Sequence, residues 1–122
     1  MIIVAIDEIN FNKAINIINN LDSSKCMIKI GSVAFNSLGH KVIEYAAQKG
    51  FDIFLDLKLH DIPNTVKKSI EGLSSLPISM LTIHTSGGKD MMMAAIEAVS
   101  GTQIKVFGLS LIHISEPTRL ES

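Results

Sequence analysis

The sequence contains little cysteine, no excess of charge of either sign and no long apolar run. Cys26 is the only cysteine among 122 residues, so an intrachain disulfide is impossible and a metal site would need histidine and carboxylate ligands. Lys and Arg number 11 against 12 for Asp and Glu, which excludes the basic excess that is typical of nucleic-acid-binding proteins. The apolar runs fall short of the roughly 18 residues that a membrane span needs, and the first residues carry no secretory signal. We therefore expect a soluble protein of the cytoplasm.

Short β-branched runs alternate with longer amphipathic stretches along most of the chain. This alternation is typical of βαβ units that build a parallel sheet. In the stretch 38–50, for example, the apolar residues Val42, Ile43, Ala46 and Ala47 recur on one face of a helix. The pattern predicts strands at 2–6, 27–31, 51–59, 79–84 and 104–108, and helices at 11–21, 38–50, 64–76 and 89–101.

Two α/β architectures share this spacing of strands. A chain of 122 residues has room for one domain with a core of its own, and a doubly wound five-stranded sheet would be complete at this length. A (β/α)₈ barrel needs about 200 residues or more, so the chain would contain only the N-terminal half of a barrel, about four βα units and a fifth strand. The pattern of apolar residues leaves both architectures open.

Charged side chains interrupt the strand predicted at 51–59. Because side chains alternate between the two faces of a strand, one face of this strand is aliphatic and the other carries the charges. The aliphatic face consists of Ile53, Leu55, Leu57 and Leu59, and the opposite face consists of Phe54, Asp56, Lys58 and His60. Asp7, Lys29 and His84 fall at the ends of other predicted strands. These ends meet at one edge of a parallel sheet, which is where α/β folds build their sites.

The charges at this edge have a structural and a functional explanation. A single strand-end charge, such as Asp7 or Lys29, is often only solvated, and a set of charges can form mutual ion pairs. Burying several charges costs several kcal/mol each, whereas leucine would fill the same space without that penalty. Two charges about 4 Å apart interact by roughly 4 kcal/mol at an effective dielectric constant of about 20, which is enough to fix Lys58 as a proton donor. Asp56 in such a network would repel a carboxylate bound beside it.

Two other candidate sites carry less weight. His60 and His84 would have to bind a metal together with Asp56, but Lys58 would repel the cation, so we expect no metal site. The loop 86–88 precedes a predicted helix, yet the chain lacks both the Walker pattern and G-x-G-x-x-G. We therefore interpret this loop as an ordinary connection between a strand and a helix.

The run DLKLHDIPNT at 56–65 resembles the signature of the orotidine 5′-phosphate decarboxylase family, which usually has an aromatic residue where this chain has Leu59. Other segments follow the family's order and spacing, namely AID around Asp7, IKIG around Lys29, GFDIFLDLK, and HTSGG before a methionine-rich helix. The resemblance extends over residues 2–108. It implies a (β/α)₈ barrel rather than a doubly wound sheet.

The resemblance also implies an activity, the decarboxylation of orotidine 5′-monophosphate to uridine 5′-monophosphate in pyrimidine nucleotide synthesis, without a metal or an organic cofactor. Lys58 matches the lysine that delivers a proton to C6 of the pyrimidine. Asp56 matches the carboxylate beside the substrate's own carboxylate. Lys29 matches the lysine that completes the charge network and contacts the ribose, and Asp7 matches a ligand of a ribose hydroxyl.

The family forms homodimers with active sites at the subunit interface. Asp61 and Thr65 match residues that reach across this interface into the partner's site, and we count Asp61 among the expected catalytic residues. The expected partners are therefore a second copy of the chain and a small nucleotide substrate, with no nucleic acid and no membrane.

The residues 109–122 depart from the family's pattern. The run LSLIHISEPTRLES leaves no room for a helix after the fifth strand. Arg119 does not match the family's phosphate-binding arginine, which belongs to the second half of the barrel. We expect residues 1–108 to form the N-terminal half of the barrel and 109–122 to be foreign or misjoined sequence. The activity is then expected in the intact gene product, with little or none in these 122 residues.

Two other functions stay open at this point. Decarboxylases and aldolases that act on sugar phosphates share an Asp-x-Lys-x-x-Asp core on the same barrel, although the HDIPNT continuation favours the orotidylate enzyme. A non-enzymatic five-stranded α/β binding domain would also be complete at this length, and it would unfold as a cooperative monomer.

Overall fold

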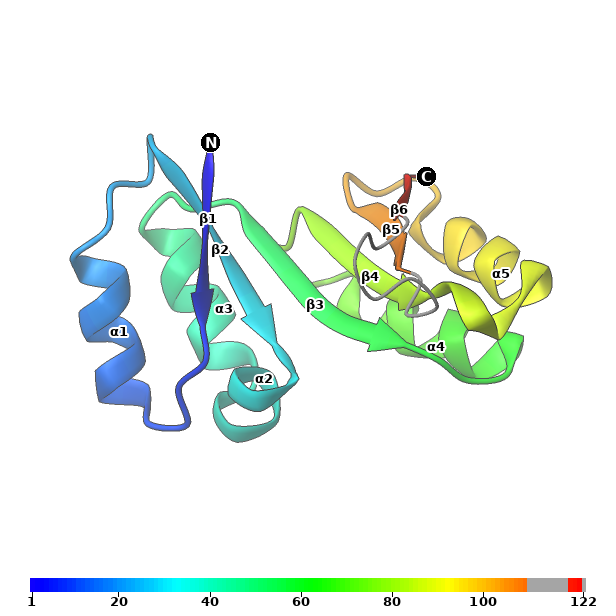
Figure 1. Ribbon diagram of the computed structural model, residues 1–122, viewed down its shortest axis with the longest axis horizontal. Coiled ribbons are helices and arrows are strands. Elements are labelled where there is room, and N and C mark those ends of the chain that lie inside the picture. Colours follow the sequence, from blue (N-terminus) through cyan, green and yellow to red (C-terminus); the bar gives the residue numbers. More distant parts are fainter. Residues whose placement is uncertain (110–118, 122) are drawn as a thin grey trace. The chain divides into compact units, whose positions relative to one another are not determined.

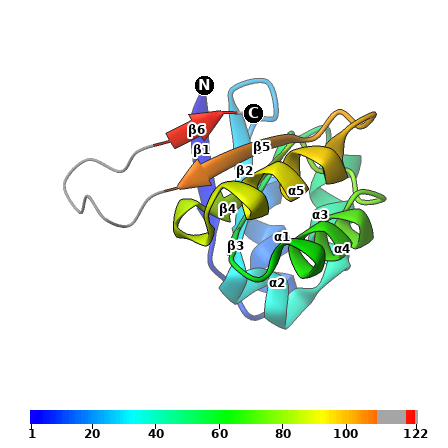
Figure 2. The ribbon, with the colours of Figure 1, turned by 90° about the vertical axis from the view of Figure 1, so that its right-hand side faces the viewer.

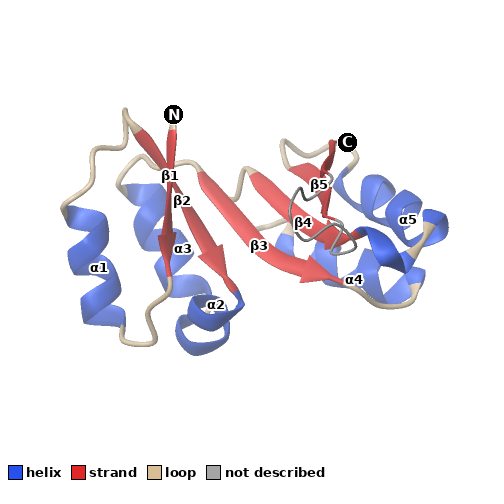
Figure 3. Cartoon of the chain, viewed as in Figure 1, coloured by secondary structure: helices blue, strands red, loops and turns tan. Residues whose placement is uncertain are grey.

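A computed structural model describes residues 1–109 and 119–121 of the chain (Figure 1). The chain divides into two compact units. Unit 1 contains Met1–Asp56 and Leu76–Ser79, and unit 2 contains Leu57–Ser75 and the described residues from Met80 onward. The predicted alternation of strands and helices runs through both units (Figure 3).

Unit 1 is built on parallel strands that pair in chain order. Its strands are β1 (Ile2–Ile6), β2 (Cys26–Gly31) and most of β3 (Ile53–Leu59), and its helices are α1 (Phe11–Asn19), α2 (Ser32–Leu38) and α3 (His40–Gln48). In this register Ile6 of β1 pairs with Ile30 of β2, and Gly31 of β2 pairs with Asp56 of β3. The end of β2 therefore lies beside the charged part of β3.

Apolar side chains of the strands and helices form the core of unit 1. Ile28, Ile30 and Ile53 are fully buried on the strands, as are Val42 and Ile43 on the predicted apolar face of α3. Removing this apolar surface from water is the main favourable contribution to folding. The resulting core holds in place the strands that carry Lys29 and Asp56.

The sequence pattern predicts one helix after β2, whereas the structure has two. α2 directly follows β2, and α3 begins at His40. Gly39 separates them with a φ of 64°, a left-handed conformation that glycine adopts without a steric penalty and that ends α2. With seven residues, α2 is too short to show a clear apolar period.

Unit 2 contains the end of β3 beside β4, and two further strands. Its elements are α4 (Pro63–Leu73), β4 (Met80–His84), the 3₁₀ turn η1 (Thr85–Gly87), α5 (Lys89–Val99), β5 (Lys105–Leu109) and β6 (Arg119–Glu121). β4 and β5 are parallel, whereas β6 runs antiparallel to β5. α4 packs against α5, which packs against β5, and both helices lie on the same side of these strands (Figure 2). As expected, Pro63 occupies the first turn of α4, where its missing N–H is not needed.

β6 is an element that the sequence pattern does not predict. Its residue Arg119 pairs with Leu109 at the end of β5. A strand of three residues is too short to reveal an alternation of apolar and polar side chains. The other residues of the atypical segment, 110–118 and 122, lie outside the described part of the chain.

The order of the strands distinguishes the two architectures left open by the sequence. Neighbouring strands follow one another along the chain in unit 1, as β1-β2-β3, and again in unit 2, as β4-β5. A doubly wound sheet reverses its order beside the first strand, whereas a (β/α)₈ barrel adds each strand next to the preceding one. The α/β class is therefore confirmed, and the order is that of a barrel. Within the described residues, the helices lack the length and apolarity needed to cross a bilayer.

Candidate active site

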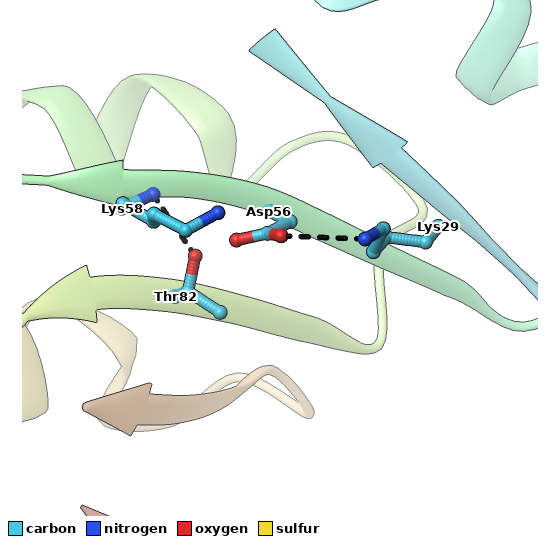
Figure 4. A network of polar contacts seen from close by, with 4 residues as sticks. All are labelled: Lys29, Asp56, Lys58 and Thr82. Carbon is cyan, nitrogen blue, oxygen red and sulfur yellow. Dashed lines mark hydrogen bonds and ion pairs between the residues drawn. The ribbon is translucent and has the colours of Figure 1, made fainter. Parts of the chain in front are cut away.

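Lys29 and Asp56 form an ion pair in unit 1. Lys29 Nζ lies 3.8 Å from Asp56 Oδ2, a separation too long for a strong hydrogen bond but within the range of an ion pair (Figure 4). Asp56 is only 8% exposed, whereas the side chain of Lys29 keeps 35% of its surface in solvent. A buried carboxylate needs compensation by a nearby cation or by hydrogen bonds. Lys29 supplies part of that compensation while its side chain stays partly exposed.

Asp7 is exposed and follows directly after β1. β1 pairs with β2 so that Ala5 lies opposite Lys29. The predicted position of Asp7 at the end of a strand is therefore confirmed, at the edge of unit 1 toward which β2 also runs.

Lys58 lies in unit 2, near the end of β3, and its backbone is unusual. Its φ of 50° makes it the one non-glycine residue with a positive φ in the described part of the chain. This left-handed conformation is uncommon for residues other than glycine. Strict alternation along residues 53–60 therefore stops at Lys58, and the predicted shared face of Phe54, Asp56, Lys58 and His60 is not a regular strand face.

Thr82 of β4 contacts Lys58 and was missed by the sequence reasoning. The Lys58 backbone N–H donates a hydrogen bond of 2.9 Å to Thr82 Oγ1 (Figure 4). Thr82 is fully buried, and in the described residues only Asp56 and Thr82 are buried polar or charged residues. The available signal was a single hydroxyl within the apolar run MLTIH.

Asp61 and Thr65 lie where β3 leads into α4. Asp61 is exposed, and its Oδ1 accepts a hydrogen bond of 2.7 Å from the N–H of Ile62. The N–H of Thr65 donates to the carbonyl of Ile62 at 3.0 Å, within the first turn of α4. The loop between strand and helix thus fixes the backbone that carries both side chains.

His60 and His84 stack on each other in unit 2. Their ring centroids are 5.0 Å apart with an interplanar angle of 19°, and His84 Nδ1 accepts a hydrogen bond of 3.2 Å from the N–H of Ser86. The lone pairs of imidazole nitrogens lie in the plane of the ring. Two stacked rings therefore direct their lone pairs along parallel planes and not toward one shared metal ion. Among the described residues, no group of three or more His, Cys, Asp or Glu side chains is arranged to hold a metal.

The structure groups the expected site residues by unit. Asp7, Lys29 and Asp56 belong to unit 1, whereas Lys58, Asp61 and Thr65 belong to unit 2. Asp56 and Lys58 are joined through β3, two residues apart in the chain. The chemical inventory is therefore two lysine ammonium groups and three carboxylates on or just after parallel strands, and a threonine in the first turn of α4.

These features define a class of protein, an α/β chain of barrel topology with ionisable side chains at the ends of its strands. A family model described as "Orotidine 5′-phosphate decarboxylase / HUMPS family" matches residues 1–122. The chain belongs to this family.

Similar proteins support the same assignment. The chain is 43% identical over 104 residues to the orotidine 5′-phosphate decarboxylase of Saccharophagus degradans, a match that covers 85% of this chain and 44% of that protein. It is 44% identical over 111 residues to the orotidine 5′-phosphate decarboxylase of Ehrlichia canis, with 91% of this chain and 49% of that protein covered.

Solved structures resemble the fold as well. The crystal structure of orotidine 5′-phosphate decarboxylase from Lactobacillus acidophilus matches with a TM-score of 0.78 and 34% identity, over 88% of this chain and 51% of that chain. An uncharacterized conserved protein from Geobacillus kaustophilus matches with a TM-score of 0.78 and 30% identity, over 88% and 53% of the two chains. The chain spans about half the length of the curated relatives it matches. Its fold is the N-terminal half of a (β/α)₈ barrel.

Proposed function

We propose that the whole protein decarboxylates orotidine 5′-monophosphate to uridine 5′-monophosphate, with catalytic groups at the ends of β2 and β3. The observation that carries this proposal is the Asp56-x-Lys58-x-x-Asp61 pattern at the end of β3, in a family member whose Lys29 pairs with Asp56 at 3.8 Å. The curated relatives named above carry the same activity in their names.

In the proposed reaction Lys58 is the proton donor. When the bond between C6 and the carboxylate breaks, CO₂ leaves and the electron pair stays on C6 as a carbanion with no adjacent π system to accept it. Catalysis must then come from electrostatic stabilisation directed at that atom. Lys58 supplies a positive charge, transfers one N–H proton to C6, and regains a proton from solvent. The step needs no oxidant and no organic cofactor.

The remaining residues of unit 1 bind and orient the substrate. Asp56 is placed beside the substrate carboxylate, where its negative charge repels the ground state and the repulsion is relieved as CO₂ leaves. The ammonium of Lys29, whose side chain is partly exposed, contacts the ribose while it compensates Asp56. Asp7, which is exposed at the end of β1, accepts a hydrogen bond from a ribose hydroxyl.

We also propose a homodimer in the cytoplasm, in which Asp61 and Thr65 complete the partner's site. Asp61 is exposed on the loop after β3, as a residue that crosses an interface has to be before assembly. Its side chain is oriented by its bond to the N–H of Ile62. The molar mass in solution tests this assignment, because an active enzyme that stays monomeric at all concentrations would contradict it.

Residues 1–108 are proposed to supply these groups as a half barrel, and 109–122 to be foreign or misjoined sequence. The contacts to the substrate phosphate then come from outside residues 1–108. Binding energy at a remote phosphate normally contributes to the chemical step, so we expect little turnover without those contacts.

The family description includes a second group, HUMPS, so membership of the family alone does not identify the substrate. The alternative left open by the sequence is a decarboxylase or aldolase that acts on sugar phosphates. Assays that measure uridine 5′-monophosphate formation and sugar-phosphate turnover side by side separate the two. This test uses a joined barrel. In this protein, residues 1–108 continue into the C-terminal part of the Saccharophagus degradans relative. We expect uridylate formation by the joined barrel. Turnover of sugar phosphates alone would refute the proposal.

A further inference from the structure

The hydroxyl of Thr82 contacts a lysine whose backbone is held in an unfavourable conformation. At φ 50°, Lys58 departs from the extended backbone of β3. Residues other than glycine occupy this region only where the surroundings hold them there. The conformation sets the direction in which the Lys58 side chain leaves the strand, so whatever holds the backbone also aims the ammonium group.

Thr82 is positioned to hold that backbone. Its Oγ1 accepts the hydrogen bond of the Lys58 N–H at 2.9 Å. Thr82 itself has no exposed surface, and its neighbours Leu81 and Ile83 on β4 are buried as well. A hydroxyl fixed in a packed strand has few alternative positions.

We propose that Thr82 is a positioning residue for the proton transfer by Lys58, an inference that rests on the proposed function. The buried hydroxyl fixes the left-handed backbone of Lys58 and so directs its ammonium group toward C6 of the substrate. Thr82 touches neither substrate nor reacting atoms in this role. It acts through the main chain of Lys58.

The chain offers a matched control in Thr102. The Oγ1 of Thr102 also accepts a backbone hydrogen bond, from the N–H of Ile104 at 3.1 Å. This bond lies in the turn before β5, away from the end of β3. Thr102→Val therefore removes an accepted backbone bond of the same kind as Thr82→Val, without touching Lys58. It also removes the bond of 2.6 Å that Thr102 Oγ1 donates to the carbonyl of Val99.

The first measurement is amide hydrogen exchange by NMR in the full chain, on the parent and on Thr82→Val, Thr82→Ala, Thr82→Ser and Thr102→Val. Loss of the acceptor in Thr82→Val or Thr82→Ala should speed exchange at the Lys58 amide roughly tenfold and leave the Ile104 amide unchanged. Thr82→Ser keeps the hydroxyl and should behave like the parent. Thr102→Val should show the reverse pattern. Unchanged exchange at Lys58 in a folded Thr82→Val or Thr82→Ala chain would overturn the proposal.

The second measurement is steady-state kinetics of the joined barrel. Thr82→Val should lower kcat about 10- to 100-fold with little change in KM, since misdirection affects the chemical step more than binding. Thr82→Ser should restore kcat, and Thr102→Val should leave it unchanged. A Thr82→Val enzyme that loses only thermal stability while keeping kcat would overturn the proposal. If Lys58→Ala keeps its activity, the proposed role of Lys58 as proton donor fails, and the exchange data still decide whether Thr82 holds Lys58.

Discussion

At the scale of single residues, Lys58 combines the side chain that we propose as proton donor with a backbone that its residue type does not favour. The left-handed conformation brings Cβ close to the following carbonyl oxygen. Glycine has no Cβ and adopts the same φ without that penalty. A residue selected for stability alone at this position would be glycine. If Lys58 has its proposed role, function and stability conflict at this position.

The left-handed backbone of Lys58 predicts that glycine and alanine at this position differ in their effect on the stability of the protein. Lys58→Gly should be more stable than Lys58→Ala by about 1 kcal/mol, because only alanine carries the Cβ that the left-handed conformation disfavours. The free energies of unfolding in urea, measured on the full chain, test this order.

Lys68 provides the matched pair for this comparison. It is exposed on α4, where glycine is less favourable than alanine by about 1 kcal/mol, so Lys68→Gly should be less stable than Lys68→Ala. The same two substitutions are thus expected to act with opposite sign at positions 58 and 68. Equal or lower stability of Lys58→Gly relative to Lys58→Ala would show that the lysine backbone is not strained.

The residue types of the site were predictable from the sequence, but the contacts were not. The charges in the strand at 51–59 were recognisable because core strands rarely carry them. The partner of the Lys58 N–H was not, since Thr82 is 24 residues away and its hydroxyl is a common feature of strands. The positive φ of Lys58 was hidden as well, because lysine gives no signal of the kind that glycine or asparagine gives.

At the scale of elements, α4 and α5 are joined by an exposed ion pair. Lys67 Nζ and Glu97 Oε1 are 2.8 Å apart. Their hydrogen bond lowers the pKa of Glu97 below the usual 4.5 and raises the pKa of Lys67 above the usual 10.5. The contribution of Glu97 to stability is therefore present above pH 4.5 and is lost as the pH falls through its folded pKa. That of Lys67 is present below pH 10.5 and is lost as the pH rises through its folded pKa.

The stability of this helix pair should accordingly depend on pH. Glu97→Gln should lower the melting temperature slightly at neutral pH, and the difference from the parent should vanish as the pH falls through the folded pKa of Glu97. Thermal unfolding at a series of pH values measures this difference. Glu44→Gln, an exposed glutamate on α3, is the control for loss of a carboxylate elsewhere. A difference for Glu97→Gln that persists in acid would mean that the substitution acts through packing instead of charge.

The longer elements followed from the sequence, whereas the shortest did not. The strands and the long helices have enough residues to show an alternation or a helical period, and each was found where expected within a few residues. The helix α2 and the strand β6 have 7 and 3 residues, so backbone pairing and the break at Gly39 determine them. The apolar pattern did not decide between a doubly wound sheet and a barrel, since strand order depends on pairing and not on local pattern. The family resemblance at residues 56–65 predicted the barrel correctly.

At the scale of the whole molecule, the described strands carry only some of the groups that the proposed reaction needs. The chain spans about half the length of its curated relatives, and its match to the Lactobacillus acidophilus enzyme covers 51% of that chain. In a (β/α)₈ barrel the residues that act on a substrate come from the ends of several strands. The half barrel described above therefore carries the proposed proton donor and its charged neighbours, while the proposed phosphate contacts lie elsewhere in the barrel.

The proposed proton transfer by Lys58 is best tested by the rate of uridine 5′-monophosphate formation. This rate is measured on the joined barrel that carries Lys58→Ala. Lys58→Ala should lower the rate by at least about 100-fold, because it removes both the proton donor and the positive charge beside C6. Lys68→Ala, which removes an exposed lysine from α4, should leave the rate unchanged. Retention of substantial decarboxylation by a folded Lys58→Ala enzyme would contradict the central claim that Lys58 delivers the proton.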